Sequence, residues 1–214
     1  SIPNKPLVNF FYTLEKCLIK TISLRIMNIL HLDSSARKEN SISRKLAKEL
    51  VQKLQGVVKY RDISHTIPFV ADIKGAGFVI PEEERTEADH KLFKFSDELV
   101  DELLESDVVV ISVPIYNFGP PASLKAWFDL IARAGKTFQY EATGPVGLIK
   151  DNKKVYLVVT SGGVPVGSPV DFCTSWLKQA LNFLGIKDIE IIAADQLAIN
   201  DDNLKKAKEK INKI

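Results

Sequence analysis

The sequence predicts an α/β domain built on five parallel strands in a doubly wound sheet, in the spatial order 2-1-3-4-5. Short apolar runs alternate along the chain with segments of helical periodicity. Two of these runs, residues 107–113 and 154–160, are almost continuously apolar and β-branched, which is typical of strands buried on both faces. Strands separated by helices pair in parallel through right-handed crossovers, and this pattern favours the doubly wound arrangement.

The elements are expected from residue 26 onward. Strands are predicted at residues 26–32, 57–63, 107–113, 154–160 and 188–193. Helices are predicted at residues 43–54, 88–105, 121–134, 171–184 and 201–213. Two connections, residues 64–90 and 135–153, are longer than a compact domain usually needs, which indicates a function or a short helix within the connection.

Residues 1–26 are treated as an N-terminal extension of upstream or vector origin, with an amphipathic helix as the alternative. The apolar part of this segment is interrupted by charges such as Glu15, Lys16 and Lys20, so it suits neither a membrane span nor a secretory signal. Residues 27–214 are expected to form one domain, which suits a chain of 214 residues.

Composition excludes several classes of function. A formal net charge of +2, from 29 basic and 27 acidic residues, gives no long-range attraction to nucleic acid or to a membrane surface. The two cysteines, Cys17 and Cys173, form no disulfide framework, and they predict reduced thiols in the cytoplasm. The three histidines share no ligand spacing, so no metal site is predicted.

Three loops are expected at the carboxyl edge of the sheet, where doubly wound folds bind ligands. The first, residues 33–43 (DSSARKENSIS), runs from a strand into a helix and supplies the hydroxyls of Ser34, Ser35, Ser41 and Ser43. Hydroxyls and a helix N-terminus bind phosphate, although Ser41 is equally well placed to cap the helix. The loop has neither a Gly-x-Gly-x-x-Gly motif nor a P-loop, which favours a monophosphate over a dinucleotide.

The second and third loops suit a flat ligand. Residues 114–121 (PIYNFGPP) form a stiff aromatic loop that can present backbone groups to a heteroaromatic ring, with a plain proline-rich turn as the alternative. Residues 160–165 (TSGGVP) contain paired glycines, which permit close approach of the backbone to a ligand, with an ordinary loop as the alternative.

Residues 114–147 resemble the central signature of the FMN-dependent NADH-azoreductases, a branch of the flavodoxin-like quinone reductases. The loop at 33–43, the glycine pair at 162–163 and residues 182–186 (NFLGI) resemble that family in the same order. The resemblance implies a flavodoxin-like fold, one FMN per subunit, NADH as electron donor and a homodimer with the flavins at the ends of its interface.

The resemblance also assigns residues. It implies that the FMN phosphate is bound by Ser35, Ser41 and Ser43. It implies that the isoalloxazine ring is lined by Pro114, Ile115, Tyr116, Asn117 and Phe118, and that its pyrimidine end meets Ser161, Gly162 and Gly163. Two departures from the family pattern are Ile42, where a polar residue is common, and a loop at 161–163 that is one residue shorter than usual.

The predicted function is reduction of quinones and azo compounds by NAD(P)H, with NADH favoured, through a ping-pong mechanism. No catalytic side chain or metal is assigned, because the flavin would carry the chemistry. Phe118, Tyr140 and Phe183 are expected to form an apolar slot over the ring, with core packing as the alternative for Phe183. Phe118, Phe138 and Tyr140 are also expected to be covered by a second subunit.

Two other classes of protein fit the sequence less well. A flavodoxin-type electron carrier is the alternative function, but such carriers are usually strongly acidic and this chain is nearly neutral. A receiver-type domain requires clustered acidic residues after the first strand, where only Asp33 is found.

Overall fold

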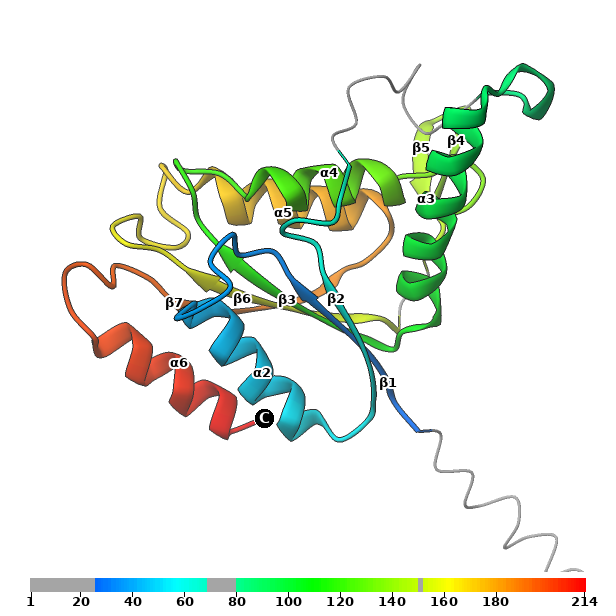
Figure 1. Ribbon diagram of the computed structural model, residues 1–214. Coiled ribbons are helices and arrows are strands. Elements are labelled where there is room, and N and C mark those ends of the chain that lie inside the picture. The colour runs from blue at the N-terminus through cyan, green and yellow to red at the C-terminus, as the bar shows by residue number, and fades with distance from the viewer. Residues whose placement is uncertain (1–25, 69–79, 150–151) are drawn as a thin grey trace, which may run out of the picture.

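A computed structural model describes residues 26–68, 80–149 and 152–214, and it contains the predicted sheet (Figure 1). Five parallel strands lie in the order β2-β1-β3-β6-β7, which is 2-1-3-4-5 among the strands of this sheet and confirms the predicted order. The strands are β1 (Asn28–Asp33), β2 (Val57–Asp62), β3 (Val108–Pro114), β6 (Lys154–Thr160) and β7 (Asp188–Ala194). Residues 1–25, the bulk of the expected extension, lie outside the described residues.

Helices cover both faces of the sheet (Figure 1). One face carries α2 (Ile42–Leu54) and α6 (Asp202–Asn212). The opposite face carries α3 (Glu87–Glu105), α4 (Ala122–Ile131) and α5 (Phe172–Phe183), which follow the expected helices to within a few residues.

The central strands supply the core on both faces, because successive side chains of a strand point to opposite sides. In β3, Val109, Ile111 and Val113 pack under α3, α4 and α5. Val108 and Val110 of the same strand pack under α2 and α6. The almost continuous apolar run that predicted a fully buried strand therefore contributes to two separate cores.

The connection at 135–153 contains an antiparallel hairpin that the sequence analysis did not predict. Its strands are β4 (Phe138–Glu141) and β5 (Gly144–Gly147), which pair from Phe138 with Gly147 to Glu141 with Gly144. The hairpin packs against the end of α5, where Ile149 N donates to Leu184 O at 3.0 Å. A Cβ on Gly147 would overlap the backbone of Leu184 and Gly185, so only glycine permits this approach. A short 3₁₀ turn, η1 (Glu82–Glu84), lies in the other long connection.

This hairpin corrects one expectation about exposed aromatic side chains. Phe138 was expected on an uncovered surface, but it is only 2% exposed and its ring centroid lies 4.7 Å from that of Phe183. The hairpin places Phe138 against the core of its own chain. Tyr140 and Phe118 are exposed, at 64% and 54%, as expected.

Candidate functional site

A cavity of about 440 Å³ lies at the carboxyl edge of the sheet. Such a volume is within the range of small-molecule and cofactor sites. The loops after β1, β3 and β6 meet there, as predicted, and the loop after β7 joins them. The lining includes the predicted residues Ser35, Ser41, Ser43, Pro114, Ile115, Tyr116, Ser161 and Gly162.

The first loop presents hydroxyls beside the N-terminus of α2. Ser41 caps this helix, since its Oγ accepts from Arg44 N at 3.4 Å, so the capping role considered from the sequence is present. Its Oγ also lies 3.1 Å from Ser43 Oγ. The first N–H groups of a helix lack partners within the helix and carry its positive dipole end. This end of the cavity can therefore bind an anion.

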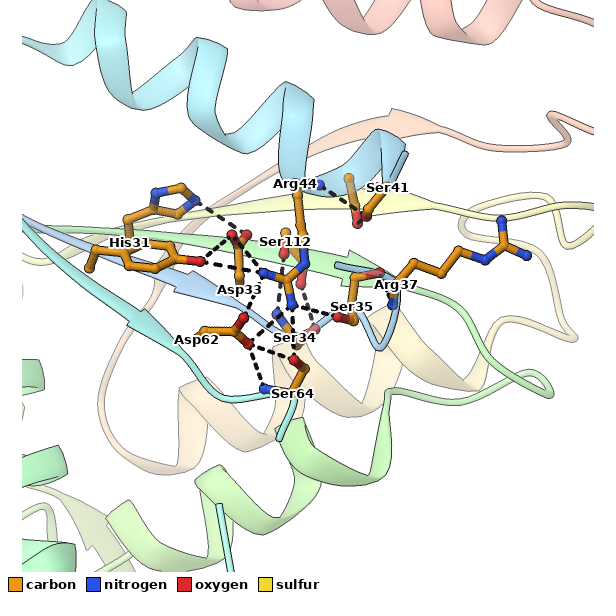
Figure 2. A network of polar contacts seen from close by, with 12 residues as sticks. His31, Asp33, Ser34, Ser35, Arg37, Ser41, Arg44, Asp62, Ser64 and Ser112 are labelled. Atoms are coloured by element: carbon orange, nitrogen blue, oxygen red, sulfur yellow. Dashed lines mark hydrogen bonds and ion pairs between the residues drawn. The ribbon is translucent and has the colours of Figure 1, made fainter. Parts of the chain in front are cut away.

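A buried cluster of polar groups supports the first loop from below (Figure 2). Arg44, on the first turn of α2, donates to both carboxylate oxygens of Asp62 at 2.9 and 3.1 Å and to Asp33 at 3.3 Å. It also donates to Ser64 Oγ at 2.9 Å and to the carbonyl oxygen of Ser35 at 2.6 Å. The guanidinium of Arg44 thus connects the first loop to the ends of β1 and β2.

Neighbouring groups in this cluster keep Asp62 ionised and Tyr60 protonated. Burial acts to raise the pKa of Asp62, but hydrogen bonds from Arg44 and Ser64 outweigh it and lower that pKa to about 2. Burial and the charge of Asp33 raise the pKa of Tyr60 to about 12. Tyr60 therefore remains a donor, and its hydroxyl bonds Asp33 at 3.0 Å.

Tyr116 connects the second loop to the first. Its Oη accepts from Ala36 N at 3.2 Å and lies 3.3 Å from Ser35 Oγ. The chain then turns back on itself, with Tyr116 and Gly119 exchanging two backbone hydrogen bonds of 3.0 Å.

The two central residues of this turn, Asn117 and Phe118, have φ of 48° and 70°. A bulky residue is rarely found at positive φ outside functional sites, so the turn holds Phe118 in a strained, exposed position. Neither residue lines the 440 Å³ cavity. Asn117 instead borders an open hollow of about 980 Å³ together with Phe172 and Trp176.

The third loop is held in place by hydrogen bonds of Ser161, the side chain that was predicted to meet the ligand. Ser161 Oγ donates to Val164 O and accepts from Gln196 N at 3.1 Å. Its carbonyl accepts from Leu197 N at 3.0 Å, and Gly162 O accepts from Ala198 N at 2.9 Å. Ser161 thus joins the loops after β6 and β7, and its hydroxyl already has a donor and an acceptor partner.

Sequence reasoning missed several residues that line the cavity. Leu197 and Ala198 follow the fifth strand of the sheet, and the position of that strand's carboxyl end would have indicated them. Arg37 and Asn40 lie inside the recognised serine loop, and Asn40 has a positive φ of 56°. An arginine beside hydroxyls was a signal for an anion that the sequence analysis did not use.

Other predicted residues lie away from the cavity. Gly163 is exposed beside Gly162 but is not part of the lining. Tyr140 and Phe183 do not line it either, and Phe183 is half-buried against the core. The predicted apolar slot is therefore not formed by Tyr140 and Phe183 at this cavity.

Within residues 26–68, 80–149 and 152–214, no group of three or more His, Cys, Asp or Glu side chains could hold a metal ion. No helix in these ranges is long and apolar enough to cross a membrane. Burial raises the pKa of Cys173 to about 12, which makes its thiol unsuitable as a nucleophile.

Comparison with known proteins agrees with this geometry. Residues 27–214 match a family model described as a flavodoxin-like fold. An FMN-dependent NADH:quinone oxidoreductase of Pelagibacter ubique is 49% identical over 88% of this chain and 100% of its own length. A protein of the same name from Hahella chejuensis is 43% identical over 86% of this chain and 92% of its own. Among solved structures, an azoreductase from Bacillus anthracis superposes with a TM-score of 0.75 at 27% identity, covering 88% of this chain and 100% of its own.

Proposed function

Because the chain belongs to the family of FMN-dependent NADH:quinone oxidoreductases, we propose that it binds FMN and uses NADH to reduce quinones and azo compounds. The observation that carries the proposal is the cavity at the carboxyl edge of the sheet, whose lining combines serines at the N-terminus of α2 with Pro114, Ile115 and Tyr116.

The residues of this cavity fit FMN from one end to the other. The phosphate would meet the hydroxyls of Ser35, Ser41 and Ser43 at the N-terminus of α2. The isoalloxazine ring would lie along Pro114, Ile115 and Tyr116, with its pyrimidine end toward Ser161 and Gly162. Because the hydroxyl of Ser161 is already bonded on both sides, the backbone of Gly162 is the better partner there.

Bound FMN would supply the redox chemistry by accepting a hydride from NADH and passing the electrons to the acceptor. The chain itself would bind the flavin, orient the reactants and shield them from water. Tyr116 and the strained turn at 117–118 fix the loop along the ring, and Phe118 projects from it as an apolar side chain for the substrate. Preorganised loops of this kind reduce the cost of orienting two reactants.

We further propose that donor and acceptor use the same place in turn, which gives ping-pong kinetics, and that NADH is preferred to NADPH. NADH as donor also suits the cytoplasmic location predicted from the cysteine content. The test is initial-rate kinetics with both nucleotides at several quinone concentrations. Parallel double-reciprocal lines are expected, and converging lines would contradict the shared site. A flavodoxin-type carrier would oxidise neither nucleotide at a useful rate.

A homodimer is proposed through the face that bears the second loop. Supporting it, Phe118, Tyr140 and Phe172 expose 54%, 64% and 62% of their surface, and such apolar exposure favours a symmetric interface. Light scattering should give about twice the 23.9 kDa of one chain. A fully active species with the mass of one chain would contradict the proposal.

A further inference from the structure

One arginine lies within the serine loop and another directly follows it, and only the first is available to a ligand. Arg44 has both terminal nitrogens engaged, with Asp62, Asp33, Ser64 and the Ser35 carbonyl as acceptors. Its side chain is 11% exposed. Turning it toward the cavity would leave two carboxylates without their cation, which is costly in a buried setting.

Arg37 has the opposite character. It is exposed and lines the same cavity as Ser35, Ser41 and Ser43. Its backbone N donates to Ser35 Oγ at 3.3 Å, but its guanidinium forms no hydrogen bond or ion pair with any residue of the described ranges. Figure 2 shows its side chain extending away from the cluster around Arg44.

Apart from Arg37, no residue in the lining of this cavity carries a charged side chain that could bind a dianion. The serines and the helix N-terminus offer neutral donors, and Ile42, which also lines the cavity, offers no donor from its side chain. Arginine matches a phosphate through its fork of N–H groups, and such charge-assisted bonds are stronger than neutral ones.

We propose that Arg37 is the cation that binds the phosphate monoester of FMN, and that Arg44 instead holds the loop in place. The inference rests on the proposed function. Arg37 would then distinguish FMN from riboflavin by charge. It would also supply a phosphate contact that Ile42 does not, since Ile42 stands where a polar residue is common in the family.

The test is flavin affinity of the full chain after removal of its flavin, measured by quenching of flavin fluorescence with FMN and with riboflavin. Arg37→Met should weaken FMN about tenfold and leave riboflavin unchanged, and Arg37→Lys should recover part of the loss. Lys38→Ala is the matched control. It removes the same charge one residue away, and Lys38 borders a separate hollow behind the loop. Its effect on FMN should be less than about twofold.

The salt dependence of FMN binding distinguishes the role of Arg37 from that of Arg44. FMN binding by the unchanged chain and by Arg44→Met should weaken as salt rises, and Arg37→Met should lose most of this dependence. An unchanged FMN-to-riboflavin ratio in Arg37→Met, or an equal loss in Lys38→Ala, would overturn the role of Arg37. If the unchanged chain binds neither flavin, the proposed function itself fails.

Discussion

Loss of Arg44 from the polar cluster should destabilise the folded chain. Replacing it with methionine keeps most of the side-chain volume and removes the cation from between Asp33 and Asp62. The side chains of these acids are 6% and 27% exposed. Breaking a buried ion pair by removing one partner typically costs about 3–5 kcal/mol.

The lower end of that range applies here because both acids keep other donors. Asp62 still accepts from Ser64 N at 2.9 Å and from its hydroxyl, and Asp33 still accepts from Tyr60 Oη. We therefore expect Arg44→Met to lower the free energy of unfolding by about 3 kcal/mol at pH 7. Urea unfolding of the flavin-free protein, followed by circular dichroism, measures this loss.

The loss should depend on pH in a defined direction. The pKa of Asp62 is about 2 in the folded chain against an ordinary value of 3.8, so its contribution is fully present above pH 3.8. It disappears as the pH falls toward 2, and about 2 kcal/mol of the difference between the two proteins should disappear with it.

Arg37→Met is the matched control, because it removes an exposed arginine of the same loop and should change stability by less than about 0.5 kcal/mol. A loss below about 1 kcal/mol in Arg44→Met at pH 7, or a loss that grows on acidification, would refute the role given to this cluster.

Further variants test other parts of the site. Replacing Ser41 and Ser43 together with alanine should weaken FMN by about 1–3 kcal/mol and leave riboflavin unaffected, and equal losses in fluorescence titrations would reduce these serines to helix caps. Phe118→Gly relieves a positive φ and should raise the free energy of unfolding by about 1 kcal/mol while lowering kcat/KM for quinones, and unchanged kcat/KM would remove Phe118 from the substrate site. Gly147→Ala should cost about 1–3 kcal/mol in urea unfolding because its Cβ has no room, whereas Gly119→Ala, whose nearest neighbour lies at 4.0 Å, should have little effect.

The fold could be predicted because its signals are local. The buried strand at 108–114 is apolar in a single segment except for Ser112, and the helix at 42–54 shows its buried stripe directly. The hairpin at 138–147 could not be found this way. Its strands have only four residues each, and the second of them (GPVG) carries no alternation of apolar and polar residues. Its position also depends on a close backbone contact between Gly147 and Gly185, which are far apart in the sequence.

The site could be predicted in outline but not in its bonding. Converging loops indicated Ser35, Tyr116 and Gly162, because carboxyl ends of parallel strands meet at one edge. The use of Ser161 as a bridge to the loop after β7 depends on contacts between distant segments. For the same reason, the sequence gives no sign that Arg44 is committed to Asp62.

The central claim is that this chain holds FMN and reduces it with NADH. The direct measurement is the visible spectrum of the purified protein, taken without oxygen before and after stepwise addition of NADH. We expect flavin absorption at one FMN per chain, bleached in full by one equivalent of NADH and restored by a quinone. A colourless protein that takes up no added FMN would contradict this expectation, and so would a bound flavin that NADH leaves oxidised.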